Sequence, residues 1–211
     1  MGIVDWLNKL KKEKKVLEGD AVKNKTYSSN NVYPTNEIAV KEFHRAKEKL
    51  FNVNKWSELP GISSSFQLYS SRGEKIHALK PEVGNYVKIV LPAPALENWV
   101  NVIDIKEHQN SAEFTVSPSP NPTEKEKGQE EIEHFFIDEA TSTFKVELQN
   151  KTLHAYEIGK NEGINNEGAE AGKRKLINTL VAEGGWAGFQ KFQWKKLTDY
   201  LVHQIEIEEK N

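Results

Sequence analysis

The sequence has 211 residues, of which 37% are hydrophobic and 28% are charged, and its formal net charge is −2. A chain of this length buries about 70% of its unfolded surface, so its core needs no disulfide bonds. It contains no cysteine, which excludes a disulfide scaffold, a thiolate metal site and a cysteine nucleophile. The balanced charge gives no indication of a polyanionic partner, so we expect no nucleic-acid binding.

Residues 1–18 are typical of a basic amphipathic helix. Ile3, Trp6, Leu7 and Leu10 recur at helical spacing, and several lysines follow them. Such a helix can lie on an anionic membrane surface, but we favour a terminal helix that docks on its own domain. The segment lacks the continuous apolar stretch of a signal peptide. We therefore expect a cytoplasmic protein with this helix and a single domain over residues 19–211.

A short strand is expected around residues 22–32, and a helix is expected to follow it. Thr35 or Asn36 is suited to cap the start of this helix, where Glu37 complements the helix dipole. We expect lysines such as Lys49 to face water, and the buried side to consist of Ile38, Val40, Phe43, Ala46, Leu50 and Phe51. The chain then turns, with Trp56 and Leu59 as anchors.

Between residues 64 and 160 the apolar residues mostly alternate with polar ones, which predicts strands rather than helices. Turn signals at residues 71–74, at residues 107–110 and around Asn150 divide this region into strands. We expect one antiparallel sheet that continues across the proline-rich loop at residues 117–133. A helix is expected from about residue 169 to residue 206, interrupted by Gly184, Gly185 and Gly188.

An antiparallel sheet with helices on one face is an α+β arrangement. The stretch from Thr35 to Gly61, including the W-x-x-L-P-G turn that begins at Trp56, resembles the helix-grip fold of the START-like, polyketide cyclase-like superfamily, often called SRPBCC. The resemblance implies a curved antiparallel sheet wrapped around a long C-terminal helix, to which this chain adds the N-terminal amphipathic helix. It also implies a space between sheet and helix that commonly holds an apolar ligand, but no particular chemistry.

The hairpin over residues 143–160 can adopt either of two registers, which differ in the residues that face the core. If its loop holds an odd number of residues, the inward set on the second strand is Thr152, His154, Tyr156 and Ile158. If the number is even, the inward set is Leu153, Ala155 and Glu157. The second register would bury a carboxylate opposite Phe144, which is costly without a partner. We therefore favour the first register.

The sequence contains no G-x-S-x-G motif, no phosphate-binding glycine loop and no H-E-x-x-H pattern. His134 and Asp138 have helical i, i+4 spacing, but they lie in an acidic stretch that we interpret as solvated. We therefore expect no cofactor and no metal.

Our first hypothesis is a protein that binds a small apolar or amphipathic molecule between the sheet and the C-terminal helix. The candidate ligand-binding residues are Tyr86, Trp99, His154, Tyr156, Phe189 and Gln193. Gln193 stands out because a buried amide among apolar neighbours needs hydrogen-bond partners, which a ligand can supply.

Two alternatives to ligand binding stay open. One is an enzyme of the cyclase, dehydratase or hydrolase type with His154 or Tyr156 as its acid–base group. The other is a structural or interaction protein without a pocket.

Overall fold

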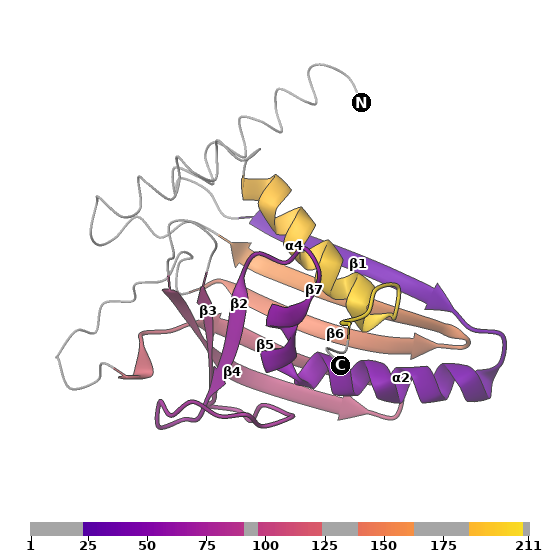
Figure 1. Ribbon diagram of the computed structural model, residues 1–211, viewed down its shortest axis with the longest axis horizontal. Helices are drawn as coiled ribbons and strands as arrows, with labels where there is room; N and C mark the ends of the chain where they lie inside the picture. The colour runs from indigo at the N-terminus through magenta and orange to yellow at the C-terminus, as the bar shows by residue number, and fades with distance from the viewer. Residues whose placement is uncertain (1–22, 91–96, 124–138, 163–185, 209–211) are drawn as a thin grey trace, which may run out of the picture.

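Seven antiparallel strands form one sheet in the order β1-β7-β6-β5-β4-β3-β2, as the computed structural model shows (Figure 1). The structure describes residues 23–90, 97–123, 139–162 and 186–208. The strands are β1 (Lys23–Val32), β2 (Ser65–Tyr69), β3 (Tyr86–Val90), β4 (Glu97–His108), β5 (Ser111–Pro118), β6 (Thr141–Gln149) and β7 (Thr152–Glu162). The prediction of a single antiparallel sheet over residues 64–160 is confirmed.

The helix α2 (Asn36–Phe51) follows β1 and covers part of one face of the sheet (Figure 1). Thr35 caps it, because its side chain accepts a hydrogen bond of 3.3 Å from the backbone N–H of Ile38. The buried stripe is Ala39, Phe43, Ala46, Lys49, Leu50 and Phe51. Two of our predictions for this helix were wrong. Ile38 and Val40 lie outside the stripe and are exposed, whereas Lys49 lies at its edge and is buried.

The second helix, α4 (Trp186–Leu201), packs against β1 and β7, while α2 packs against β6 (Figure 1). Leu197, Tyr200 and Leu201 bury its inner side. The helix ends at Leu201, before the predicted end at residue 206. The expected residues 169–185 of this helix, like the N-terminal helix predicted over residues 1–18, lie outside the described part of the chain. Among the described residues, no helix is both long and apolar enough to cross a membrane.

The core is built around an aromatic cluster between α2 and the sheet. The 3-10 helix η1 (Val53–Glu58) places Trp56 at its centre, where Trp56 is 1% exposed. Its ring centroid lies 5.0 Å from that of Phe144, 5.6 Å from that of Phe66 and 5.9 Å from that of Phe114. Leu59 is buried too, so both predicted anchors of this turn are confirmed.

The β6–β7 hairpin adopts the register that we did not favour. Gln149 pairs with Thr152, so the loop has two residues, Asn150 and Lys151. Asn150 has φ 56°, a conformation that asparagine tolerates and that two-residue hairpin turns require. Leu153, Ala155 and Glu157 are therefore the residues of β7 that lie on the helix-facing side of the sheet.

A second change of register lies in β4. An irregularity between Val102 and Asp104 interrupts the pairing of β4 with β5. Val100 and Val102 face the core, so Ile103 lies on the other face and is 44% exposed, and the irregularity then returns Ile105 to the core side. The resulting architecture is the predicted α+β helix-grip fold, in which the curved antiparallel sheet lies against α4.

Candidate ligand-binding site

Glu157 is the most unusual buried group on the helix-facing side of the sheet. It lies between Tyr27 of β1 and Phe144 of β6, and its side chain is completely buried. Among the described residues, neither of its carboxyl oxygens has a hydrogen-bond partner. Burial raises the pKa of Glu157 well above its ordinary value, and the charge of Glu162 raises it further. Ser142 opposes this shift in pKa, but its hydroxyl does not reach hydrogen-bonding geometry.

A second carboxyl group, that of Glu162, lies close to Glu157 on the same strand. Glu162 is 1% exposed. A Cβ atom at Gly159 would collide with its carboxylate, so this carboxylate lies directly over Gly159. Gly159 is the next inward position after Glu157, since side chains alternate along a strand. The absence of a side chain at Gly159 therefore makes room for two neighbouring acidic groups.

Gln193 extends from α4 toward the interior and is 2% exposed. Its Nε2 atom donates a hydrogen bond of 2.8 Å to Ser63 Oγ, in the segment between η1 and β2. Its Oε1 atom has no hydrogen-bond partner in the described part of the chain. Gln193 is therefore a buried amide with one polar atom that has no partner among the described residues.

One aromatic contact links the two polar positions. Phe144 is the cross-strand neighbour of Glu157, and its ring centroid lies 5.5 Å from that of Trp194 at an interplanar angle of 65°. Trp194 directly follows Gln193 and also contacts Phe66 at 6.4 Å. Glu157 is thus the neighbour of Phe144 on the sheet, and Gln193 is the neighbour of Trp194 along α4. We call this set the β7–α4 site.

Other polar groups under α4 are paired. The Ser29 hydroxyl of β1 is buried, lies 2.8 Å from Thr198 Oγ1 and donates to Asp199 Oδ1 at 2.6 Å. Lys195 Nζ donates to the same hydroxyl at 3.0 Å. These contacts fix the second half of α4 on β1, so we assign them a structural role.

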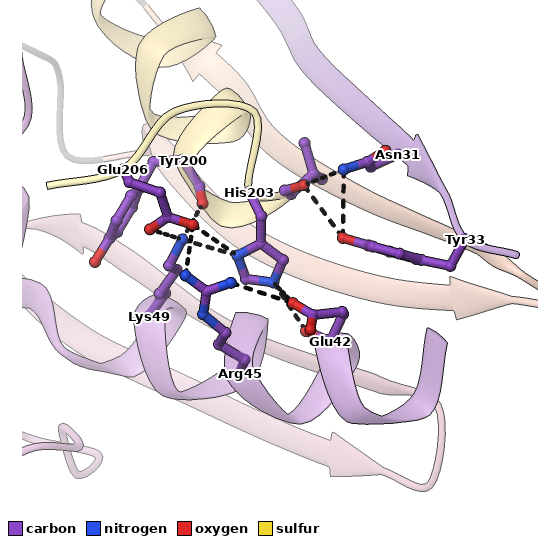
Figure 2. Close-up of polar contacts among 9 residues, drawn as sticks. Asn31, Tyr33, Glu42, Arg45, Lys49, Tyr200, His203 and Glu206 are labelled. Carbon is purple, nitrogen blue, oxygen red and sulfur yellow. Dashed lines mark hydrogen bonds and ion pairs between the residues drawn. The ribbon is translucent and has the colours of Figure 1, made fainter. Parts of the chain in front are cut away.

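A second polar cluster joins α2 to the tail that follows α4, and we call it the α2–tail cluster (Figure 2). Lys49 is at its centre, and its side chain is 9% exposed. Lys49 Nζ donates to Tyr200 O at 3.0 Å and to Glu206 Oε2 at 2.8 Å, and it lies 2.8 Å from His203 Nδ1. Burial lowers the pKa of Lys49, and Glu206 opposes this effect.

The protonation state of His203 follows from the same contacts (Figure 2). Because Lys49 can only donate, His203 Nδ1 accepts, and the ring proton is on Nε2. This Nε2–H donates to Glu42 O at 3.0 Å. Burial, joined by the charge of Lys49, lowers the pKa of His203, while the hydrogen bond to Glu42 opposes it. The imidazole is therefore neutral at pH 7, and every polar atom of the ring is paired.

The structure places the six predicted ligand-binding residues on different faces. Tyr86 and Trp99 lie on the face of β3 and β4 opposite to the buried Val87 and Val100. His154 and Tyr156 also face away from the helices, with their rings stacked at 6.1 Å. Our expectation that these two side chains point into the interior was wrong, because the two-residue turn shifts β7 by one position.

Phe189 belongs to α4, but the surroundings of its side chain lie outside what the structure describes. Gln193 is thus the predicted residue that the β7–α4 site contains. His134 and Asp138 also lie outside the described residues, and within them no group of three or more acidic or histidine side chains is arranged to hold a metal.

Sequence analysis missed Glu157, although a signal for it was present. Asn150 followed by Lys151 suits a two-residue hairpin loop, and that loop length is the one that turns Glu157 inward. The cost of burying a carboxylate led us to the other register. Lys49 had no comparable signal, because its partners come from residues more than 150 positions later in the chain.

No protein-family model and no curated protein matches the sequence. Solved structures do match the fold. A hypothetical protein from Helicobacter pylori has a TM-score of 0.52 at 10% identity, over 90% of this chain and 92% of that one. Norcoclaurine synthase from Thalictrum flavum has a TM-score of 0.40 at 11% identity, over 90% and 93%. Major latex-like protein 151 from Panax ginseng has a TM-score of 0.37 at 12% identity, over 77% and 95%.

At these identities the similarity concerns the fold alone. The strand order and the packing of α4 against β1 and β7 define this fold. The chain therefore has the helix-grip α+β fold that its sequence led us to expect.

Proposed function

We propose that the protein binds a small amphipathic molecule between the sheet and α4. The apolar body of this molecule packs near the Phe144–Trp194 contact, and its polar end pairs with Glu157 and Gln193. The observation that supports the proposal is the pair of buried polar groups that lack partners among the described residues, on the same side of the sheet.

The energetic argument concerns the cost of leaving such groups unpaired. A buried polar group without a hydrogen bond costs about 1–3 kcal/mol of stability. Elsewhere under the helices the chain provides partners, as it does for Ser29 and Lys49. Two groups left without partners at the same site are therefore best explained by a ligand that completes their hydrogen bonds.

The alternative of an enzyme relied on His154 or Tyr156 as an acid–base group inside the protein. His154 and Tyr156 lie on the sheet face opposite to Gln193, so they do not share an interior site with it. We therefore retain ligand binding as the proposal. The following experiment distinguishes ligand binding from a purely structural role.

Native mass spectrometry of the purified full-length protein tests the proposal directly. We expect a small molecule to stay bound after gentle purification and to dissociate under denaturing conditions. The variant Gln193→Leu nearly keeps the side-chain volume and should retain less of this molecule. Its free energy of unfolding should fall by less than about 1 kcal/mol, since the exposed Ser63 hydroxyl can bond water instead.

Gln204→Leu is the matched control, because Gln204 is exposed and donates to Asn30 O at the far end of α4. It should retain as much ligand as the unaltered protein. A protein that carries no small molecule and binds none when apolar compounds are added would contradict the proposal and favour a purely structural role.

A further inference from the structure

The polar atoms left without a partner at the β7–α4 site are of one chemical kind. They are the two carboxyl oxygens of Glu157 and the amide oxygen of Gln193, which have no hydrogen bond from any residue that the structure describes. The amide nitrogen of Gln193 already donates to Ser63. With Glu157 ionised, the site therefore offers acceptors and needs donors.

One acidic and one basic side chain lie near Glu157. The carboxyl group of Glu162 lies over Gly159, next to Glu157, so two acidic side chains share a buried region. Lys25 lies opposite Gly159 on β1, and its charge opposes the rise in the pKa of Glu157. Burial and Glu162 outweigh Lys25, since the net shift of this pKa is strongly upward. Burial therefore favours the protonated form of Glu157 in the absence of a cation.

The neighbouring aromatic rings suit the rest of such a ligand. Phe144 and Trp194 meet edge to face beside Glu157, and Phe66 lies next to Trp194. Aromatic faces attract both apolar groups and ammonium ions. An ammonium group attached to a small aromatic or aliphatic body would thus find complementary surroundings at both ends.

We infer that the ligand of the β7–α4 site is a small primary amine with an apolar body, whose ammonium group pairs with Glu157 and donates to Gln193 Oε1. The inference rests on the proposed ligand-binding function and specifies its ligand class. When the ammonium ion binds, the Glu157 carboxyl group releases its proton to the solvent and becomes the carboxylate partner. The amine enters as its cation and stays protonated, so up to one proton is released per molecule bound.

Isothermal titration calorimetry of the full-length protein with three matched probes tests the inference. Benzylamine, benzyl alcohol and benzoate share one ring and differ in the charge of the head group. At pH 7 we expect benzylamine to bind about tenfold or more tighter than benzyl alcohol, because a hydrogen bond between charged groups is stronger than a neutral one. Benzoate should bind most weakly. Titrations in buffers of different ionisation enthalpy should show release of protons with benzylamine and none with benzyl alcohol.

Two variants identify the group that releases the proton. Glu157→Gln is nearly isosteric and should abolish both the proton release and the preference for benzylamine over benzyl alcohol. Glu147→Gln, on the other face of β6, is the control and should change neither quantity. Gln193→Leu, a second test that leaves Glu157 in place, should weaken benzylamine binding severalfold and keep the proton release.

The outcomes separate the inference from the proposed function. Benzyl alcohol binding as tightly as benzylamine, or an amine preference that persists in Glu157→Gln, would overturn the inference and leave ligand binding standing. If none of the three probes binds at millimolar concentration and no molecule co-purifies, both the inference and the proposed function are wrong.

Discussion

Two regions of this protein bury ionisable side chains beneath its helices, and they differ in the hydrogen bonds that these side chains make. In the α2–tail cluster, Lys49 contacts three partners, and both ring nitrogens of His203 are bonded (Figure 2). In the β7–α4 site, no described residue bonds either carboxyl oxygen of Glu157. A fully paired cluster fastens one element to another, whereas an unpaired group reduces stability and is better explained by function.

The two regions also respond to pH with opposite sign. The pKa of Glu157 is raised in the folded state, so its contribution to stability is complete below its ordinary pKa and is lost as the pH rises through the raised value. The pKa of His203 is lowered, so its contribution is complete above its ordinary pKa and is lost as the pH falls. A rise in pH therefore destabilises the β7–α4 site, and a fall in pH destabilises the α2–tail cluster.

The largest expected effect is a loss of stability as the pH rises. In the ligand-free protein, the free energy of unfolding should fall by up to about 1.4 kcal/mol per pH unit between the ordinary pKa of Glu157 and its raised value. Glu157→Gln should remove this fall, because glutamine does not titrate. Urea denaturation at several pH values from about 5 to 8 measures the slope. If the unfolding free energies of Glu157→Gln and Glu147→Gln had equal slopes against pH, the loss of stability would not come from Glu157.

The next effect concerns the paired cluster. Lys49→Met keeps the apolar stem but leaves Tyr200 O and His203 Nδ1 without their donor, so it should cost about 1–3 kcal/mol. Lys47→Met on the same helix removes only a partly exposed ion pair with Glu107 and should cost less than about 1 kcal/mol. Chemical denaturation of both variants gives the comparison. Equal losses would show that the α2–tail cluster contributes no more than a surface contact.

The acid response of His203 should be confined to a narrower range of pH. As the pH falls below the ordinary value of 6.5, the unaltered protein should lose stability, because protonated His203 would face Lys49 and could no longer accept its hydrogen bond. His203→Gln should lower the stability at pH 7 but flatten this acid-side decrease. His154→Gln, on the outer face of β7, should leave it unchanged. Thermal unfolding between about pH 5 and pH 7 distinguishes them.

The smallest effect tests the turn that directs Glu157 inward. Asn150 has φ 56°, so Asn150→Ala should cost about 1 kcal/mol, whereas Asn150→Gly should be neutral or stabilising. Melting temperatures of the two variants measure the difference. If alanine were tolerated as well as glycine, Asn150 would not adopt the left-handed conformation, and the two-residue turn would be in doubt.

Patterns that depend on local spacing could be predicted from the sequence. The alternation along β5, the helix after Thr35 and the anchors Trp56 and Leu59 are all confirmed, because each reflects burial on one side of a regular element. The face of β7 was predicted wrongly, because a single residue in a turn reverses which side chains are buried. The bulge in β4 has the same effect on the residues that follow it.

The candidate site was accessible to sequence reasoning only in part. Gln193 could be identified as an amide among apolar neighbours on a helix. Glu157 was missed, since the rule that buried charges are costly outweighed the turn signal at Asn150 and argued against the register that the chain adopts. Such rules describe stability, and a residue that opposes them is a candidate for function. Lys49 depends on contacts with the distant tail, which no local pattern reveals.

The titration of the Glu157 carboxyl group is the most direct test of a buried acid that lacks a protein partner. In protein labelled with ¹³C at glutamate, the chemical shift of this carboxyl carbon can be followed against pH, and Glu157→Gln assigns the signal. The structure predicts that the ligand-free protein titrates at a pKa well above the ordinary glutamate value of 4.5. A midpoint at or below that value would show a solvated or ion-paired carboxylate and would contradict the proposed site.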